Sequence, residues 1–269
     1  MEILIVCAFL FVFGLAIGSF LNVVIYRVIH GDSPMRGRSY CDNCKKLIPW
    51  YDNIPLFSFL VLKRKCRYCK TPISWTYPAI ELLTGLLFVW WYLVGFTFFR
   101  LTATPFTLVQ PLFWLAVALL LLVIFATDLF SFLIPDSAVY LLTILAFSYR
   151  IALTVRHIMT ISDFWVYLAS AIACSVFFYL LVLLTHHKGM GLGDVKLVFP
   201  LGLLVGWPLL LFVIMLASIA GSIVGITTIV VGAKNLKSKL PFGPFLIGAT
   251  CVALLWGDHI LSFYSKLAL

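Results

Sequence analysis

Among the acidic side chains in or beside long apolar runs of the chain, four are candidates for chemistry: Glu81, Asp128, Asp136 and Asp194. A carboxylate in such a place is costly and is therefore a candidate functional group. Asp128 lies deep in the run LLLLVIFATDLFSFLIPD, with no turn signal before it and no new helix beginning directly after it. Helix capping does not explain Asp128, so the sequence favours a functional role over that of partner to a buried donor.

The other three acidic residues each have a structural explanation. Asp136 follows a proline and precedes an apolar run, which is typical of a helix N-cap. Glu81 lies near the start of another run, where the helix dipole favours a carboxylate. Asp194 ends the segment Gly-Met-Gly-Leu-Gly-Asp at 189–194, and it could equally cap the helix that begins at Val195. The alternating glycines favour a functional role, because they let the backbone approach a carboxylate closely.

A pair of facing carboxylates would supply acid–base chemistry. Two such groups can share one proton, since like charges at close range cannot both ionise cheaply. One carboxylate then activates a water as general base, while the other protonates a peptide carbonyl and later the leaving amine. The chain has no H-E-x-x-H motif and no evident Ser/His/Asp set, so the paired aspartates Asp128 and Asp194 are the favoured catalytic groups.

Four of the seven cysteines form two Cys-x-x-Cys pairs, at Cys41 and Cys44 and at Cys66 and Cys69, separated by 21 residues. This spacing resembles a zinc ribbon with a slightly long gap. Four thiolates complete a closed tetrahedron around zinc, so the metal would be structural rather than catalytic. Two disulfides or a redox role are alternatives, but the positive charge of the loop predicts a reducing compartment.

The elements that carry these residues are membrane helices. The chain is 63% hydrophobic and 11% charged, whereas a soluble domain carries about 25% charged residues. Helices of about 20 residues span a bilayer core. Eight apolar runs are present, at 3–26, 78–99, 110–130, 137–155, 164–184, 195–206, 208–232 and 242–263. We therefore predict an all-α polytopic membrane protein with about eight transmembrane helices, of which the sixth is short and the first is a retained helix rather than a signal peptide.

The positive charges predict the orientation of these helices. Ten of the nineteen Lys and Arg residues lie in the loop 27–75. If this loop is cytoplasmic and the spans alternate, fifteen of the nineteen fall inside, as the positive-inside rule requires. Asp128 and Asp194 then lie at the same cytoplasmic face. This loop also accounts for most of the net charge of +9. We expect the loop to lie against anionic lipid headgroups, and nothing indicates nucleic-acid binding.

Several motifs, taken in order, resemble those of the type IV prepilin peptidases, the bifunctional leader peptidases and N-methyltransferases of pilus, type II secretion and competence systems. The motifs are the segment 18–27 (GSFLNVVIYR), the two Cys-x-x-Cys pairs, 50–55 (WYDNIP), 73–81 (ISWTYPAIE), Asp128 with Ile134-Pro135-Asp136, 191–196 (GLGDVK) and 241–245 (PFGPF). One departure is Val28-Ile29, where family members often have Leu-Pro.

The resemblance implies an eight-span bacterial inner-membrane aspartic endopeptidase with Asp128 and Asp194 as the catalytic pair. Its partners would be membrane lipid and a prepilin or pseudopilin substrate, cut after a glycine that ends a short basic leader. It also implies N-methylation of the new N-terminal residue from S-adenosylmethionine. No G-x-G-x-x-G motif follows a strand pattern, so the residues that bind the methyl donor are not predicted, with Glu81 and the loop as weak candidates.

The segments divide by expected role. Residues 1–26 are the first transmembrane helix, 27–76 the cytoplasmic four-cysteine domain associated with methyl transfer, and 77–269 the peptidase domain of seven transmembrane helices. Two other functions use the same residues. A proton-coupled transporter would use the carboxylates as a relay, and a zinc-stabilised membrane scaffold would need no catalysis.

Overall fold

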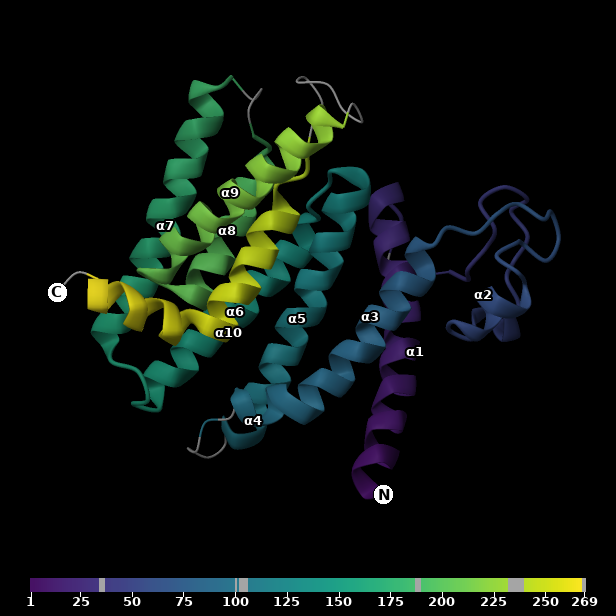
Figure 1. Ribbon diagram of the computed structural model, residues 1–269, viewed down its shortest axis with the longest axis horizontal. Helices are drawn as coiled ribbons and strands as arrows, with labels where there is room; N and C mark the ends of the chain where they lie inside the picture. Colours follow the sequence, from purple (N-terminus) through teal and green to yellow (C-terminus); the bar gives the residue numbers. More distant parts are fainter. Residues whose placement is uncertain (34–36, 100, 102–105, 187–189, 232–239, 268–269) are drawn as a thin grey trace. The chain divides into compact units, whose positions relative to one another are not determined.

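The computed structural model describes residues 1–33, 37–99, 101, 106–186, 190–231 and 240–267. Within these residues the chain is helical and contains no strand beyond two isolated bridges, Tyr40 with Leu47 and Lys65 with Pro72. The helices drawn in Figure 1 are α1 (Glu2–His30), α2 (Phe57–Val61), α3 (Thr76–Trp90), α4 (Phe96–Phe98), α5 (Phe106–Ser131), α6 (Asp136–Val155), α7 (Ile161–Leu184), α8 (Leu192–Val205), α9 (Leu209–Val230) and α10 (Gly243–Leu267). The prediction of an all-α protein is confirmed.

Six helical segments in the described ranges are long and apolar enough to cross a membrane, so the protein is a multi-pass membrane protein. They are α1, the continuous segment Thr76–Phe98, α5, α6, α7 and α9. The predicted count of about eight is not confirmed. The helix α8 has 14 residues, and the apolar part of α10, Gly243–Gly257, is shorter than the length required.

The chain forms two compact units, Met1–Leu119 and Leu120–Leu269, and the boundary lies within α5. The predicted segments 1–26, 27–76 and 77–269 were divided by expected function and not by compact packing. This division therefore stays a prediction. Several residues used in the sequence argument lie outside the described ranges: Arg36, Arg100, His187, Lys188, Gly189, Lys234, Lys237 and Lys239.

In the first unit, α1 packs along α3 because glycines let the two backbones approach. A Cβ atom added at Gly18 would lie 2.7 Å from the Cα of Glu81, and one at Gly14 would lie 2.8 Å from the Cα of Gly85. Small residues spaced four apart are typical of close helix pairs in membranes. Farther along, the amide of Asn22 donates to the carbonyl of Tyr77 at 2.9 Å, which fixes the register of the pair.

In the second unit, α8 is the central helix and contacts α6, α7, α9 and α10. Nine of its fourteen residues are buried, from Asp194 to Val205. Gly202 allows the contact with α7, since a Cβ atom there would lie 2.7 Å from the Cα of Ala171. A helix surrounded in this way can be short, because its apolar residues face protein rather than lipid.

The C-terminal end of α8 is held by Arg150 of α6. Its guanidinium donates to the carbonyls of Leu203 and Leu204 at 2.7 and 2.6 Å, and it lies 3.6 Å from the ring centroid of Tyr167. The last carbonyls of a helix lack intrahelical donors, and a cation there also complements the helix dipole. Arg150 therefore fixes one end of the helix whose other end carries Asp194.

Candidate active site

Asp128 lies in the last turn of α5 and is 5% exposed. One of its oxygens, Oδ2, accepts a hydrogen bond from the backbone N–H of Gly243 at 2.9 Å. Gly243 is the first residue of α10, where backbone N–H groups have no intrahelical acceptor. A Cβ atom at this position would lie 2.5 Å from the same oxygen. Only glycine lets the start of α10 approach this carboxylate so closely.

Asp194 lies in the first turn of α8, is 8% exposed and follows the glycines of the predicted motif. Its Oδ1 atom is buried without a hydrogen-bond partner among the described residues. The Asp128 carboxylate lies close enough to disfavour a negative charge on Asp194. The structure therefore brings together the two aspartates selected from the sequence, which are separated by 66 positions.

Ile134, in the connection between α5 and α6, packs against both glycines next to the aspartates. A Cβ atom at Gly193 would lie 3.0 Å from the Cβ of Ile134, and one at Gly243 would lie 3.4 Å from its Cδ1. The side chain of Ile134 thus sets the spacing between the starts of α8 and α10. Neither Ile134 nor the Gly243 amide was selected as a site residue from the sequence, although both belong to the motifs 134–136 and 241–245.

The interpretation of Asp136 as an N-cap is wrong. Pro135 occupies the N-cap position of α6, Asp136 is the first helical residue, and no side-chain cap hydrogen bond is formed. The Asp136 carboxylate instead accepts from the ammonium of Lys196 at 2.8 and 2.9 Å. This exposed ion pair joins the start of α6 to α8 two residues beyond Asp194. The residue has a structural role as expected, but through a different contact.

The four cysteines of the first unit form one cluster. All four Sγ atoms lie within 4.8 Å of one another, and those of Cys41 and Cys69 are 3.7 Å apart. Four sulfurs at about 2.3 Å from a zinc ion lie about 3.8 Å apart in a tetrahedron, so the cluster fits the ion. The hydroxyl of Thr71 lowers the pKa of Cys69 to about 5, whereas burial raises that of Cys41 to about 11.

Each Cys-x-x-Cys pair has the same local structure. The N–H of Cys41 donates to the carbonyl of Lys46, and that of Lys45 donates to the carbonyl of Cys41, at 3.0 and 2.8 Å. In the second pair, Cys66 N–H donates to Thr71 and Lys70 N–H to Cys66, at 2.9 and 3.1 Å. Lys45 and Lys70 have positive φ angles of 55° and 60°, which turn the backbone around each pair of sulfurs. Two such turns facing one ion are the structure expected of a zinc ribbon.

Glu81 lies in the first unit, on α3, and is 8% exposed. Its Oε2 atom accepts from the backbone N–H of Leu56 at 2.9 Å, so the carboxylate ties the four-cysteine segment to the membrane helix. Glu81 also lines a cavity of about 470 Å³, together with residues of α1 and of both Cys-x-x-Cys pairs. The expectation of a carboxylate at the helix N-terminus is wrong, because α3 begins at Thr76 and its first turn holds no acidic residue; Glu81 lies one turn farther along and faces a cavity.

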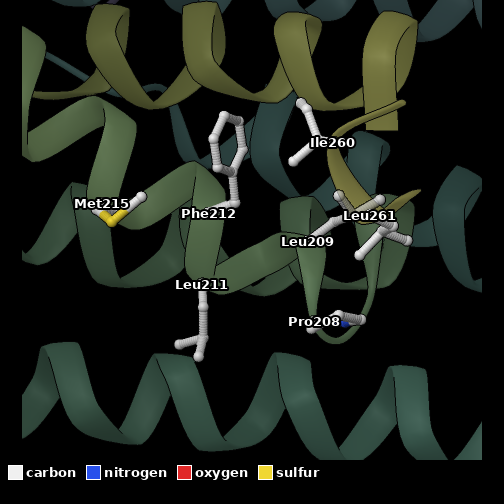
Figure 2. A pocket seen from close by; sticks show the side chains of 7 residues that line it. All are labelled: Pro208, Leu209, Leu211, Phe212, Met215, Ile260 and Leu261. Carbon is white, nitrogen blue, oxygen red and sulfur yellow. The ribbon is translucent and has the colours of Figure 1, made fainter. Parts of the chain in front are cut away.

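A second cavity, of about 260 Å³, lies between α9 and α10 in the second unit. Figure 2 shows that its lining is apolar: Pro208, Leu209, Leu211, Phe212, Met215, Ile260 and Leu261. No side chain there can transfer a proton or hold a charge, so this cavity is not a candidate active site.

The second unit by itself has features of a membrane-embedded hydrolase, because it buries two neighbouring carboxylates among apolar helices. Comparison with known proteins agrees with this class. Residues 12–94 match the bacterial peptidase A24 N-terminal domain, and residues 115–226 match the type IV leader peptidase family. No solved structure matches.

Curated relatives cover nearly the whole chain. Proteins named "Prepilin leader peptidase/N-methyltransferase" are 35% identical in Aeromonas hydrophila, over 94% of this chain and 92% of the relative, and 32% identical in Legionella pneumophila, with the same coverage. The relative of the same name in Bacillus subtilis is 32% identical over 97% of this chain and 98% of its own length. The chain belongs to the type IV leader peptidase family, as the sequence motifs suggested, and is a peptidase with methyltransferase activity.

Proposed function

We propose that the chain cleaves the basic leader of type IV prepilins or pseudopilins after a glycine, with Asp128 and Asp194 as the catalytic pair. The observation that carries this proposal is the burial of both carboxylates within electrostatic reach of each other. The relatives are named for cleavage of prepilin leaders. A substrate with a basic leader and an apolar helix would place its scissile bond at the membrane surface, which we propose is the cytoplasmic face of the inner membrane.

The two carboxylates have different surroundings, which supports different roles. The Gly243 N–H stabilises a negative charge on Asp128, since donation to a charged acceptor is stronger than to a neutral one. Asp194 has a buried oxygen without a donor, so ionisation there is less favourable. We therefore assign the shared proton to Asp194 and the negative charge to Asp128.

Hydrolysis then proceeds in two proton-coupled steps. Asp128 accepts a proton from water as the water oxygen attacks the carbonyl carbon, while Asp194 donates its proton to the carbonyl oxygen. In the second step the C–N bond breaks, and the amine nitrogen takes the proton held by Asp128. The hydroxyl of the intermediate returns a proton to Asp194 as the carboxylic acid forms, which restores the starting state.

The four-cysteine segment completes the proposed function. Cys41, Cys44, Cys66 and Cys69 would hold a structural zinc ion, and the segment would serve N-methylation of the new N-terminal residue. S-adenosylmethionine is the methyl donor that this activity implies. We place this loop in the cytoplasm because of its ten positive charges.

Mass spectrometry of a candidate prepilin tests the proposal. Purified protein in detergent is incubated with the prepilin, with and without S-adenosylmethionine. We expect loss of the leader in both samples and a gain of one methyl group only with the donor. Asp128→Asn and Asp194→Asn should each reduce cleavage by at least about 1,000-fold, as removal of a catalytic group does. The matched control is Asp163→Asn, an exposed aspartate in the first turn of α7.

Three results would contradict the assignment. Wild-type cleavage rates in both Asn variants would exclude the pair as catalytic groups. Proton or solute flux in liposomes that disappears in Asp128→Asn, without any cleavage by the wild type, would favour the transporter. A chain that binds about one zinc ion but never acts on a prepilin would be a scaffold.

A further inference from the structure

The short helix α2 displays apolar side chains on one face, although few residues of the segment around it are buried. Phe57, Leu60 and Val61 are 60%, 72% and 58% exposed, and their spacing places them on one side of the helix. Large apolar side chains gathered on a surface typically mark a site of interaction. We propose that these three side chains, the α2 face, insert into the lipid bilayer beside α1 and α3, and that the basic residues after α2 bind anionic headgroups.

Contacts on the other side of α2 fix which way the helix faces. Ser58 is buried there, and its hydroxyl donates to the carbonyl of Tyr51 at 2.9 Å. The ring of Phe59 packs against that of Trp75, with 5.0 Å between the two centroids. These contacts hold one side of α2 against its own segment. The α2 face therefore stays turned outward and needs another partner to cover it.

The start of α2 is tied to a helix long enough to cross the membrane. Leu56, the N-cap residue of α2, donates its backbone N–H to the carboxylate of Glu81 at 2.9 Å. Glu81 lies about 7.5 Å along the axis of α3, which begins at Thr76. A helix at a membrane surface buries its apolar face about 5–10 Å into the boundary between headgroups and acyl chains. The hydrogen bond therefore holds α2 at a depth where its apolar face meets lipid.

The residues around the α2 face match a membrane surface in charge and in type. Lys63, Arg64 and Lys65 follow α2 closely in the sequence and are exposed. Basic side chains beside a membrane are attracted to anionic headgroups. Trp75, which directly precedes α3, is 62% exposed, and tryptophan is enriched at the headgroup level of membrane proteins. An apolar stripe with a basic end and a neighbouring tryptophan is the composition that a lipid surface binds.

Lipid is also the partner that the neighbouring helices favour. Only 17% of the apolar stretch of α1 and 33% of that of Thr76–Phe98 is buried, so both helices present most of their surface to lipid. The α2 face begins beside these helices and extends the same apolar surface. The inference does not depend on which reaction the chain performs, because it concerns only how the four-cysteine segment is attached to the membrane.

Photo-crosslinking identifies what covers the α2 face. The photoreactive amino acid p-benzoylphenylalanine replaces Leu60 in the full-length chain, which is reconstituted in nanodiscs of phosphatidylcholine with or without phosphatidylglycerol. We expect mass spectrometry to find lipid as the main adduct, with a yield about threefold higher when the anionic lipid is present. The matched control position is Leu47, which is 52% exposed beside the first Cys-x-x-Cys turn. The probe there should give at least about fivefold less lipid adduct, because Leu47 is not part of an apolar helix face.

Two further measurements test the headgroup contact and the integrity of the segment. Lys63→Gln combined with Lys65→Gln should remove the gain that phosphatidylglycerol produces and leave the adduct yield in phosphatidylcholine unchanged. Hydrogen exchange on the unmodified chain guards against a disturbance by the probe. Backbone amides of 57–62 should exchange about threefold more slowly in anionic than in neutral nanodiscs.

Several outcomes would overturn the proposal. Adducts from Leu60 to residues of the second unit, or to an added prepilin, in place of lipid would show that a protein surface covers α2. The absence of any adduct would show that the side chain lies in water. Equal lipid yields at Leu47 and Leu60 would mean that contact with lipid is not specific to the α2 face. Exchange rates in 57–62 that do not respond to anionic lipid would exclude the headgroup contact.

Discussion

The four-cysteine segment and the region around α8 hold functional groups in opposite ways. Among the described residues of 31–75, only Ser58 is buried as a whole residue, so the segment has almost no apolar core. In α8, nine of fourteen residues are buried. The first region is held by turns around four thiols and by polar contacts such as the double hydrogen bond from Arg67 to Asp52, at 2.6 and 2.7 Å.

The difference follows from what each region has available to fold it. Burial of apolar side chains stabilises by about 25 cal/mol per Å², and a segment with one buried residue gains little from it. A structural metal can replace this contribution because its binding free energy becomes folding free energy. The two aspartates are placed instead by glycines and helix ends.

Removal of the metal should produce the largest difference between the two regions, in protease sensitivity and in activity. Structural zinc sites contribute about 10–16 kcal/mol in small domains, far more than this segment can otherwise gain. We expect a chelator to make residues 37–75 sensitive to protease and to abolish methyl transfer, while leader cleavage continues. Zinc content by mass spectrometry, about one ion per chain before chelation, and the peptide map after brief proteolysis measure the effect.

The cysteine variants provide the matched control for metal removal. Cys44→Ser removes one of the four sulfurs and should reproduce the effect of the chelator. Cys251→Ser changes an exposed cysteine outside the cluster and should have no effect. An unchanged protease map together with full methyl transfer in Cys44→Ser would show that the segment folds without a metal.

The next largest effect is expected in the region around α8, from a substitution that adds a single methyl group at Gly243. In Gly243→Ala the new Cβ atom would lie 2.5 Å from Oδ2 of Asp128, so the carboxylate must rotate and lose its amide donor. A hydrogen bond to a charged group contributes about 1.5–3 kcal/mol. We therefore expect kcat for leader cleavage to fall about 10- to 100-fold, with methyl transfer to a pre-cleaved pilin unchanged.

Gly248→Ala is the control for that substitution, because it lies in the same helix and its Cβ atom would have nothing within 4 Å. Both variants should unfold at the same temperature as the wild type within a few degrees. Equal cleavage rates in Gly243→Ala and the wild type would mean that the amide does not support Asp128 during the reaction.

The sequence was most informative where a residue had no ordinary explanation. Asp128 stood out because no cap or turn accounts for it, and the structure buries it beside Asp194. The two Cys-x-x-Cys pairs were equally informative, since four sulfurs within 4.8 Å follow from their spacing. The local pattern of residue types and the lengths of the apolar runs were sufficient to predict these features and most of the helices.

Contacts between distant segments could not be predicted in the same way. The Gly243 amide lies 115 positions from Asp128, and Lys196 lies 60 positions from Asp136. The number of spans also depends on packing, because α8 is apolar yet short and buried by neighbouring helices. Each of these features depends on which helix surfaces pack against each other. Neighbouring residues in a single sequence do not determine that packing.

The ion pair between Asp136 and Lys196 should have the smallest effect, although it lies next to the proposed catalytic pair. Its side chains are 53% and 45% exposed, and exposed pairs contribute about 0–1 kcal/mol. Asp136→Asn should therefore reduce kcat for cleavage by no more than about fivefold and leave KM unchanged. The reversed pair, Asp136→Lys with Lys196→Asp, should recover most of this loss, because the contact between α6 and α8 is restored with opposite charges. A loss of 100-fold or more in Asp136→Asn that the reversed pair does not recover would instead place Asp136 among the groups that transfer protons. The catalytic group would then include Asp136 as well as Asp128 and Asp194, since the placement of two aspartates by helix ends and glycines would not explain so large a loss.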